Sequence, residues 1–232
     1  MANFQTHVGT AAILGAAYGA AGTLGWHLDW GLAFLAAGLC TLGGMLPDLD
    51  SDSGRPVREL SILAGFIFPI LLIPRLRRFG LSLEQGIVIV IGAHFLIRYA
   101  LAAVIRRTTV HRGMFHSLPA LAISGLVIFL VYHNENLMQR CYVAVAVMVG
   151  FLSHLLLDEL YAVNFNGVAI KLNQFAGSAV KLRSSSWKAN LFTYALLAGL
   201  GYLAWDSLKE RGIMTPRDLS DAFHREVVRP GR

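Results

Sequence analysis

The chain has 232 residues, of which 55% are hydrophobic and only 15% are charged, whereas soluble domains carry about 25% charged residues. Together with a mean hydropathy of +0.55, this composition excludes an ordinary soluble domain and predicts one compact membrane domain. The formal net charge is +6, and the basic residues lie between apolar runs rather than in one block. That distribution favours membrane-surface contact and control of topology, so we expect no nucleic-acid partner.

Seven apolar runs follow one another along the chain, at 10–26, 30–47, 60–74, 86–105, 117–133, 140–160 and 190–206. A bilayer core about 30 Å thick requires about 20 helical residues, which 86–105 and 140–160 provide and the other runs approach. We therefore predict an all-α, polytopic membrane helix bundle of about 5–7 helices. Run 60–74 is broken by Pro69 and Pro74 and could be a tilted span or a re-entrant hairpin. Whether run 190–206 spans fully is also open.

Small residues mark the first run, where Gly15 and Gly19 form a GxxxG pair that predicts close helix packing. The segment 207–232 is instead polar, and we separate it as a tail from the membrane domain at 1–206. Within the tail, Thr215, Pro216 and Asp218 have the pattern of a helix start. Four apolar residues then share one helix face, namely Leu219, Ala222, Phe223 and Val227. The tail is predicted to form a short amphipathic helix, on the membrane or against the body.

Four polar motifs border or interrupt the apolar runs, and each contains side chains that bind metals. The candidate metal ligands are His7, Asp48, Asp50, His111, His116, His154 and Asp158. His154 and Asp158 are the most informative pair, because a spacing of four puts both on one helix face. They also lie in an apolar span, where ionisable groups are costly and usually functional.

Local chain geometry at two other motifs suits ligation. Asp48 and Asp50 follow Pro47, which ends a helix and frees the backbone. His111 and His116 would diverge by about 140° on a regular helix, so they need a turn between them, which Gly113 permits. Taken alone, each motif also has a structural interpretation as a terminal histidine, a solvated turn or an interfacial pair.

The order of the runs tests whether the four motifs can meet. His7 begins on one side of the membrane, and each successive pair of crossings returns the chain to that side. All four motifs therefore reach the same face, provided that the third and fourth runs both cross or both fail to cross.

At these motifs the chain resembles the YdjM-like family of predicted membrane-bound metal-dependent hydrolases. The matching segments are His7-Val8-Gly9, Leu46-Pro47-Asp48-Leu49-Asp50, His111-Arg112-Gly113 with His116-Ser117, and His154 to Asp158, with Asp158 to Tyr161 and Ala176 to Lys181 resembling one branch. The resemblance spans about residues 5–185 and excludes the tail. It implies a multi-pass protein of the bacterial inner membrane and a metal-dependent hydrolytic activity.

Seven candidate ligands are too many for one catalytic zinc, which typically has three protein ligands and a water. One solution is a dinuclear site bridged by an aspartate. The other is a single ion, with the remaining groups acting as base and as supporting partners. Mixed His and Asp ligands fit zinc, manganese or iron, and we expect zinc or manganese, one or two ions. Asp48, Asp50 and His116 are the candidates for direct catalytic roles.

The preferred reaction is hydrolysis of a phosphoester by a metal-activated water. Arg58, Arg112 and Lys181 flank the motifs and could hold phosphate oxygens, although topology and headgroup contact explain them as well. A site at a membrane face suits a lipid or lipid-linked substrate. The alternatives are a metal or ion transporter, and a membrane scaffold or stress-response protein with a structural metal.

Basic residues between the runs predict the orientation. Nine lie on the candidate face and four on the opposite face, which favours a cytoplasmic site by the positive-inside rule. The tail opposes this prediction, because it adds six basic residues to the opposite face if the seventh run spans. The sequence does not predict the oligomeric state.

Overall fold

A computed structural model describes residues 3–50, 55–108, 116–165, 170–172, 181–213 and 215–228. The described residues form helices almost throughout, with one short antiparallel strand pair. The elements are α1 (Phe4–Trp26), α2 (Trp30–Gly43), the 3-10 helix η1 (Pro47–Asp50), α3 (Arg55–Arg78), α4 (Leu83–Thr108), α5 (Leu118–Val131), α6 (Leu137–Ala162), β1 (Val163–Phe165), β2 (Ile170–Leu172), α7 (Trp187–Lys209) and α8 (Pro216–Val228). The all-α bundle with a short C-terminal helix is thereby confirmed.

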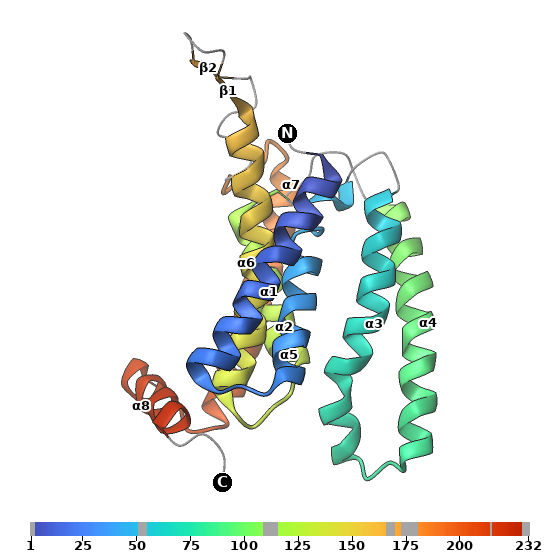
Figure 1. Cartoon of the computed structure of the whole chain (residues 1–232), viewed down its shortest axis with the longest axis vertical. Coiled ribbons are helices and arrows are strands. Elements are labelled where there is room, and N and C mark those ends of the chain that lie inside the picture. The colour runs from blue at the N-terminus through green and yellow to red at the C-terminus, as the bar shows by residue number, and fades with distance from the viewer. Residues whose placement is uncertain are drawn as a thin grey trace.

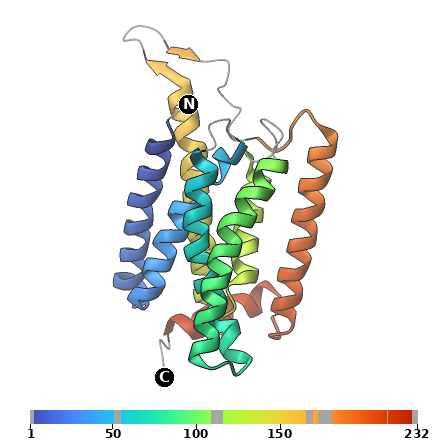
Figure 2. The same ribbon diagram turned by 90° about the vertical axis from the view of Figure 1, so that its right-hand side faces the viewer.

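Successive long helices run in opposite directions, so that η1 and the starts of α1, α3, α5 and α7 lie at one end of the bundle (Figures 1 and 2). We call this the η1 end. The tail helix α8 lies at the other end, which we call the α8 end. Helix α6 occupies the centre and contacts α1, α2 and α5, while α3 and α4 form an antiparallel pair beside α2.

Three helical segments are long and apolar enough to cross a membrane, judged by length and composition within the described residues: Phe4–Trp26, Leu137–Tyr161 and Trp187–Lys209. Exposed tryptophans mark both ends of α7, and Trp187 and Trp205 are 18 residues apart. That spacing corresponds to about 27 Å of helix, close to the thickness of a bilayer core. Since tryptophan favours membrane interfaces, these residues indicate where the bundle meets the two interfaces.

Glycines allow α1, α2 and α6 to approach closely. A Cβ atom on Gly150 of α6 would overlap the carbonyl oxygen of Cys40, and one on Gly43 of α2 would overlap that of Val147. On α1, a Cβ at Gly15 would lie 2.7 Å from the carbonyl oxygen of Ala37. Small residues permit such close packing between membrane helices, so the predicted packing role of the first run is confirmed.

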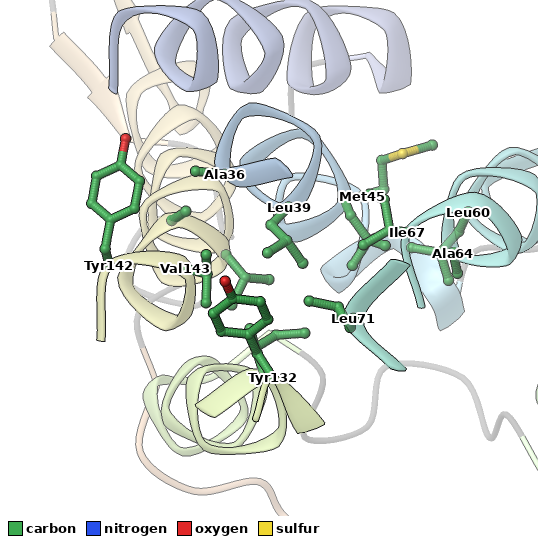
Figure 3. Close-up of a cluster of buried hydrophobic side chains, with 14 of the residues drawn as sticks. Ala36, Leu39, Met45, Leu60, Ala64, Ile67, Leu71, Tyr132, Tyr142 and Val143 are labelled. Carbon is green, nitrogen blue, oxygen red and sulfur yellow. The ribbon is translucent and has the colours of Figure 1, made fainter. Parts of the chain in front are cut away.

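Helix α3 attaches the α3–α4 pair to this core. Leu60, Ala64, Ile67 and Leu71 share one face of α3 and lie in a buried cluster with Leu39 of α2 (Figure 3). The helix is continuous past Pro69, so of the two interpretations of run 60–74 the structure adopts a through-going helix rather than a hairpin. Prolines are tolerated in membrane helices where neighbouring groups satisfy the freed backbone.

The tail packs against the body at the α8 end. The Thr215 hydroxyl accepts from the Asp218 N–H at 3.2 Å, and the Asp218 carboxylate accepts from the Thr215 N–H at 2.8 Å, which confirms the predicted cap. Ala222 is buried in a cluster that includes Leu137 and Ala204. A cavity of about 550 Å³ adjoins α8 and contains none of the predicted metal ligands; its polar lining is His133, Glu135, Ser207, Glu210, Arg211 and Arg225.

Candidate metal centre

Five of the seven candidate ligands have described side chains, and all five converge at the η1 end: His7, Asp48, His116, His154 and Asp158. They come from α1, η1, the residue before Ser117 and α6, which are far apart in sequence. Asp50 lies at the end of η1, but its side chain is outside the described part of the structure, as are His111 and Arg112. We call the five converging residues the His/Asp cluster.

Helix α6 supplies the centre of this cluster. His154 and Asp158 lie on the same face of α6 and are only 0% and 4% exposed. Nδ1 of His154 lies 2.8 Å from the carbonyl oxygen of Gly44. A carbonyl can only accept a hydrogen bond, so Nδ1 carries a proton, and in the neutral form of the ring Nε2 is the nitrogen that turns a lone pair toward the carboxylates.

The distances around Nε2 of His154 are those of metal ligands rather than of hydrogen bonds. This nitrogen lies 3.7 Å from Oδ1 of Asp48 and 3.6 Å from Oδ2 of Asp158, beyond the usual hydrogen-bond range of about 2.7–3.2 Å. It is buried and has no hydrogen-bond partner among the described residues. Ligands bound at about 2.1 Å to one tetrahedral ion are about 3.4 Å apart. A cation between these groups would relieve the repulsion between the lone pair and the carboxylates, so the residues fit a metal ion.

His7 and His116 complete the surroundings of Asp158. Nε2 of His7 lies 3.2 Å from Oδ1 of Asp158, and Nε2 of His116 lies 3.8 Å from Oδ2. The side chain of Asn3 caps the first turn of α1 by accepting from the Thr6 N–H, which sets the position of His7 within that turn. The His7 ring stacks on the His154 ring with centroids 3.6 Å apart and planes 14° apart.

Backbone contacts hold His116 in place. Its neighbour Ser117 caps α5 by accepting from the Ala120 N–H at 3.3 Å. The Leu118 N–H donates to the Lys181 carbonyl oxygen at 3.1 Å. His116 is therefore fixed between the start of α5 and the segment that leads into α7.

Burial sets the charge state at the rim of the cluster. It lowers the pKa of His116 to about 4, with a further lowering by the nearby imidazole of His154 and partial opposition from Asp158. The imidazole is therefore neutral at pH 7 and can bind a metal or accept a proton. Burial also raises the pKa of the Asp48 carboxyl, against the opposing influence of His154 and His7. The side chains of Asp48 and His116 are 17% and 14% exposed, respectively, so the cluster opens on the side of these two residues.

The three predicted phosphate-binding residues lie in different surroundings. Lys181 is half-buried and close enough to His116 for its charge to lower the pKa of that imidazole. Arg58 has a 70% exposed side chain and pairs with Glu59 at 2.8 Å. Arg112 lies outside the described residues. Of the three candidates, Lys181 is therefore the one that the described structure brings close to the cluster.

Sequence reasoning missed the glycines that position His154. Gly44 supplies the carbonyl oxygen that fixes its tautomer, and Gly150, one turn earlier on α6, lets the end of α2 come close enough. A signal was present, because Gly150 and His154 are four residues apart and therefore share a helix face. The pair Gly43-Gly44 likewise precedes the LPDLD motif, with only Met45 between them.

The fold and the cluster define a class of protein, a multi-helix membrane protein with a buried His/Asp cluster at one end of its bundle. The family model described as "YdjM inner membrane protein" matches residues 1–216. The chain therefore belongs to the YdjM inner membrane protein family, which confirms the resemblance and an inner-membrane location. No curated protein and no solved structure matches the chain significantly. The match extends past residue 206, and the division of the chain there stays a prediction.

Proposed function

We propose that the chain is a metal-dependent hydrolase that cleaves a phosphoester of a membrane lipid or lipid-linked substrate. The observation that carries the proposal is the position of Nε2 of His154, which lies 3.7 Å from a carboxylate oxygen of Asp48 and 3.6 Å from one of Asp158. A divalent ion there, zinc or manganese, would supply a water made acidic enough to act as a nucleophile near neutral pH.

The depth of the cluster supports a lipid headgroup as the substrate. The Lys181 backbone joins the start of α5 beside His116, and Lys181 is only six positions before the exposed Trp187. Tryptophan favours the headgroup level. This short distance along the chain supports a position for the open side near the level at which a phosphoester of a lipid resides.

Each side chain has a task in this proposal. His154, with its tautomer fixed by Gly44, and Asp158 hold the ion. Asp48 and His116 lie on the open side, where a carboxylate or a neutral imidazole can accept a proton from the attacking water. Lys181 attracts the phosphate to that side. Asp50, His111 and Arg112 keep their predicted roles as ligands and phosphate contact.

A transporter is less well supported by the same depth argument. Transport sites tend to lie near the midplane of the bilayer. His154 is eight residues, or about 12 Å, from the C-terminal end of α6, and Asp158 is about 6 Å from it. Both lie in the last turns of a helix of 26 residues, and Asp48 and His116 lie outside the long helices, so the cluster as a whole is nearer the end of the bundle than its middle.

Purified full-length protein, loaded with Zn²⁺ or Mn²⁺ in lipid nanodiscs, tests the proposal. We expect bound metal by elemental analysis and release of phosphate or of a phosphorylated headgroup from a panel of phospholipids and lipid phosphates. Asp48→Asn should retain the fold and lose turnover. The matched control is His224→Ala, an exposed histidine of α8, which should change neither metal content nor turnover.

The same experiment separates the competing functions. A metal-loaded protein that leaves the whole panel intact contradicts the proposed hydrolase. Loss of folding on chelation, with no turnover before it, favours a structural metal and a scaffold role. Metal uptake into sealed proteoliposomes favours the transporter.

The proposed cytoplasmic orientation of the cluster rests on loop charges. Because α7 ends at the α8 end, the basic residues of the tail offset the excess at the η1 end. A reporter fused to the C-terminus tests the orientation. A cytoplasmic cluster requires the reporter on the opposite side of the membrane, and a cytoplasmic reporter contradicts it.

A further inference from the structure

The stacked rings of His7 and His154 restrict how the cluster can hold metal. The two planes are 14° apart and their centroids are separated by 3.6 Å. An imidazole binds a metal through the lone pair of a ring nitrogen, which lies in the plane of the ring. A single ion cannot lie in two nearly parallel planes at this separation. The rings of His7 and His154 can therefore bind ions only at two different positions.

The oxygens of Asp158 are divided in the same way. Oδ1 lies 3.2 Å from Nε2 of His7, whereas Oδ2 lies 3.6 Å from Nε2 of His154. Oδ2 also faces Nε2 of His116 at 3.8 Å. One carboxylate therefore turns a different oxygen toward each of the stacked rings.

We propose that the cluster binds two divalent cations bridged by the carboxylate of Asp158, an inference that rests on the metal dependence in the proposed function. The first position lies between His154 and Oδ2 of Asp158, with Asp48 and His116 beside it on the open side. The second is formed by His7 and Oδ1 of Asp158. Paired cations in hydrolases of phosphoesters are typically about 3.5–4 Å apart, which agrees with the spacing of the stacked rings.

The two positions differ in the number of protein ligands that the described residues supply. Four side chains surround the first position, and two surround the second. We therefore expect sequential loading, with the first ion bound more tightly. In a one-ion centre, by contrast, His7 would act through Asp158, as a hydrogen-bond partner that orients the carboxylate.

Manganese provides the probe, because two Mn²⁺ ions held by one carboxylate are magnetically coupled. Full-length protein in nanodiscs is titrated with Mn²⁺, the bound ions are counted by elemental analysis, and the electron paramagnetic resonance spectrum is recorded at each step. We expect two ions per chain, with an uncoupled signal at the first equivalent and a coupled signal at the second. His7→Ala should retain one ion and the uncoupled signal, while His224→Ala should match the wild-type protein.

The outcomes separate this inference from the proposed function. One uncoupled ion per wild-type chain, with phosphoester turnover intact, overturns the two-cation centre and leaves the hydrolase standing. Two coupled ions without any turnover support the centre and contradict the hydrolase. A folded His7→Ala protein that keeps two coupled ions overturns the assignment of the second position. Should that variant fail to fold, the count and the spectrum of the wild-type protein still decide the question.

Discussion

The two ends of the bundle each bury ionisable side chains, but the distances from these side chains to their polar neighbours differ between the ends. At the α8 end, Arg140 is 1% exposed and its guanidinium donates to the Phe129 carbonyl oxygen at 3.0 and 3.3 Å and to the Ser207 hydroxyl at 3.2 Å. It also lies 4.1 Å from the centre of the Phe129 ring. At the η1 end, the His/Asp cluster brings nitrogen and oxygen atoms to 3.2–3.8 Å.

This difference separates a buried charge that supports the fold from a buried cluster whose atoms are spaced like the ligands of a cation. Donors at hydrogen-bond distance from acceptors, as at Arg140, are satisfied by the protein itself. A lone pair turned toward carboxylates, as at His154, is satisfied only when a cation or proton lies between them. We therefore expect substitutions at the α8 end to change stability and substitutions at the η1 end to change metal binding.

The largest effect should come from Gly150→Ala, a single substitution that is expected to lower both the stability of the fold and the affinity for metal. The added Cβ would overlap the carbonyl oxygen of Cys40, so α2 and α6 must move apart and the contact from His154 to Gly44 is lost. We expect a loss of about 3 kcal/mol in the free energy of unfolding, the upper part of the overpacking range, together with weaker metal binding. Thermal unfolding and metal titration measure both. Gly199→Ala is the control, because its Cβ would meet nothing within 4 Å among the described residues. Equal behaviour of the two variants would refute the packing argument.

Asp158→Asn should affect metal binding alone. The amide keeps the shape of the side chain but is a poor metal ligand, so we expect the affinity to fall by about 100-fold or more. The metal-free protein should unfold within about 1 kcal/mol of the wild type. Metal at 100 times its dissociation constant stabilises a protein by about 2.7 kcal/mol, and this gain should disappear in the variant. A full stabilisation by metal in Asp158→Asn would mean that the ion binds elsewhere.

Arg140→Met should have the opposite signature. Methionine fills much of the space but leaves the Phe129 carbonyl oxygen and the Ser207 hydroxyl without their donor, which should cost about 2 kcal/mol of stability. Metal affinity should stay within twofold, because the residue lies at the other end of α6. Denaturation in detergent and metal titration test the two parts. If Arg140→Met lowered metal affinity as strongly as Asp158→Asn, the contrast between the ends would fail.

The sequence predicted the bundle and the meeting of the motifs for physical reasons. Apolar runs indicate segments buried in lipid, and the spacing of His154 and Asp158 predicts that they share a helix face. The count of crossings then placed His7 and Asp48 at the same end. It placed His116 there as well, because α3 and α4 form a through-going antiparallel pair.

Two features could not be predicted from the sequence, because they depend on backbone atoms or on contacts between helices that are distant in sequence. The acceptor for His154 is a backbone carbonyl at Gly44, and any residue carries such a group. Arg140 is one of the four basic residues that the loop count assigns to the face opposite the cluster, together with Arg75, Arg77 and Arg78, whereas its partners on α5 and α7 make it a buried structural residue. Sequence alone does not reveal which helices become neighbours, so neither role could be predicted.

The smallest predicted effect compares two cations near the η1 end. Lys181 acts on His116 electrostatically, whereas Arg58 is exposed and paired with Glu59. If Lys181 attracts the substrate phosphate, Lys181→Ala should raise KM for a lipid phosphate about tenfold, equivalent to about 1.4 kcal/mol, with little change in kcat or metal content. Arg58→Ala should change KM by less than about twofold, because exposed ion pairs contribute little. Steady-state kinetics in nanodiscs measures both. A larger effect at Arg58 than at Lys181 would move the substrate phosphate to the α3 side of the cluster.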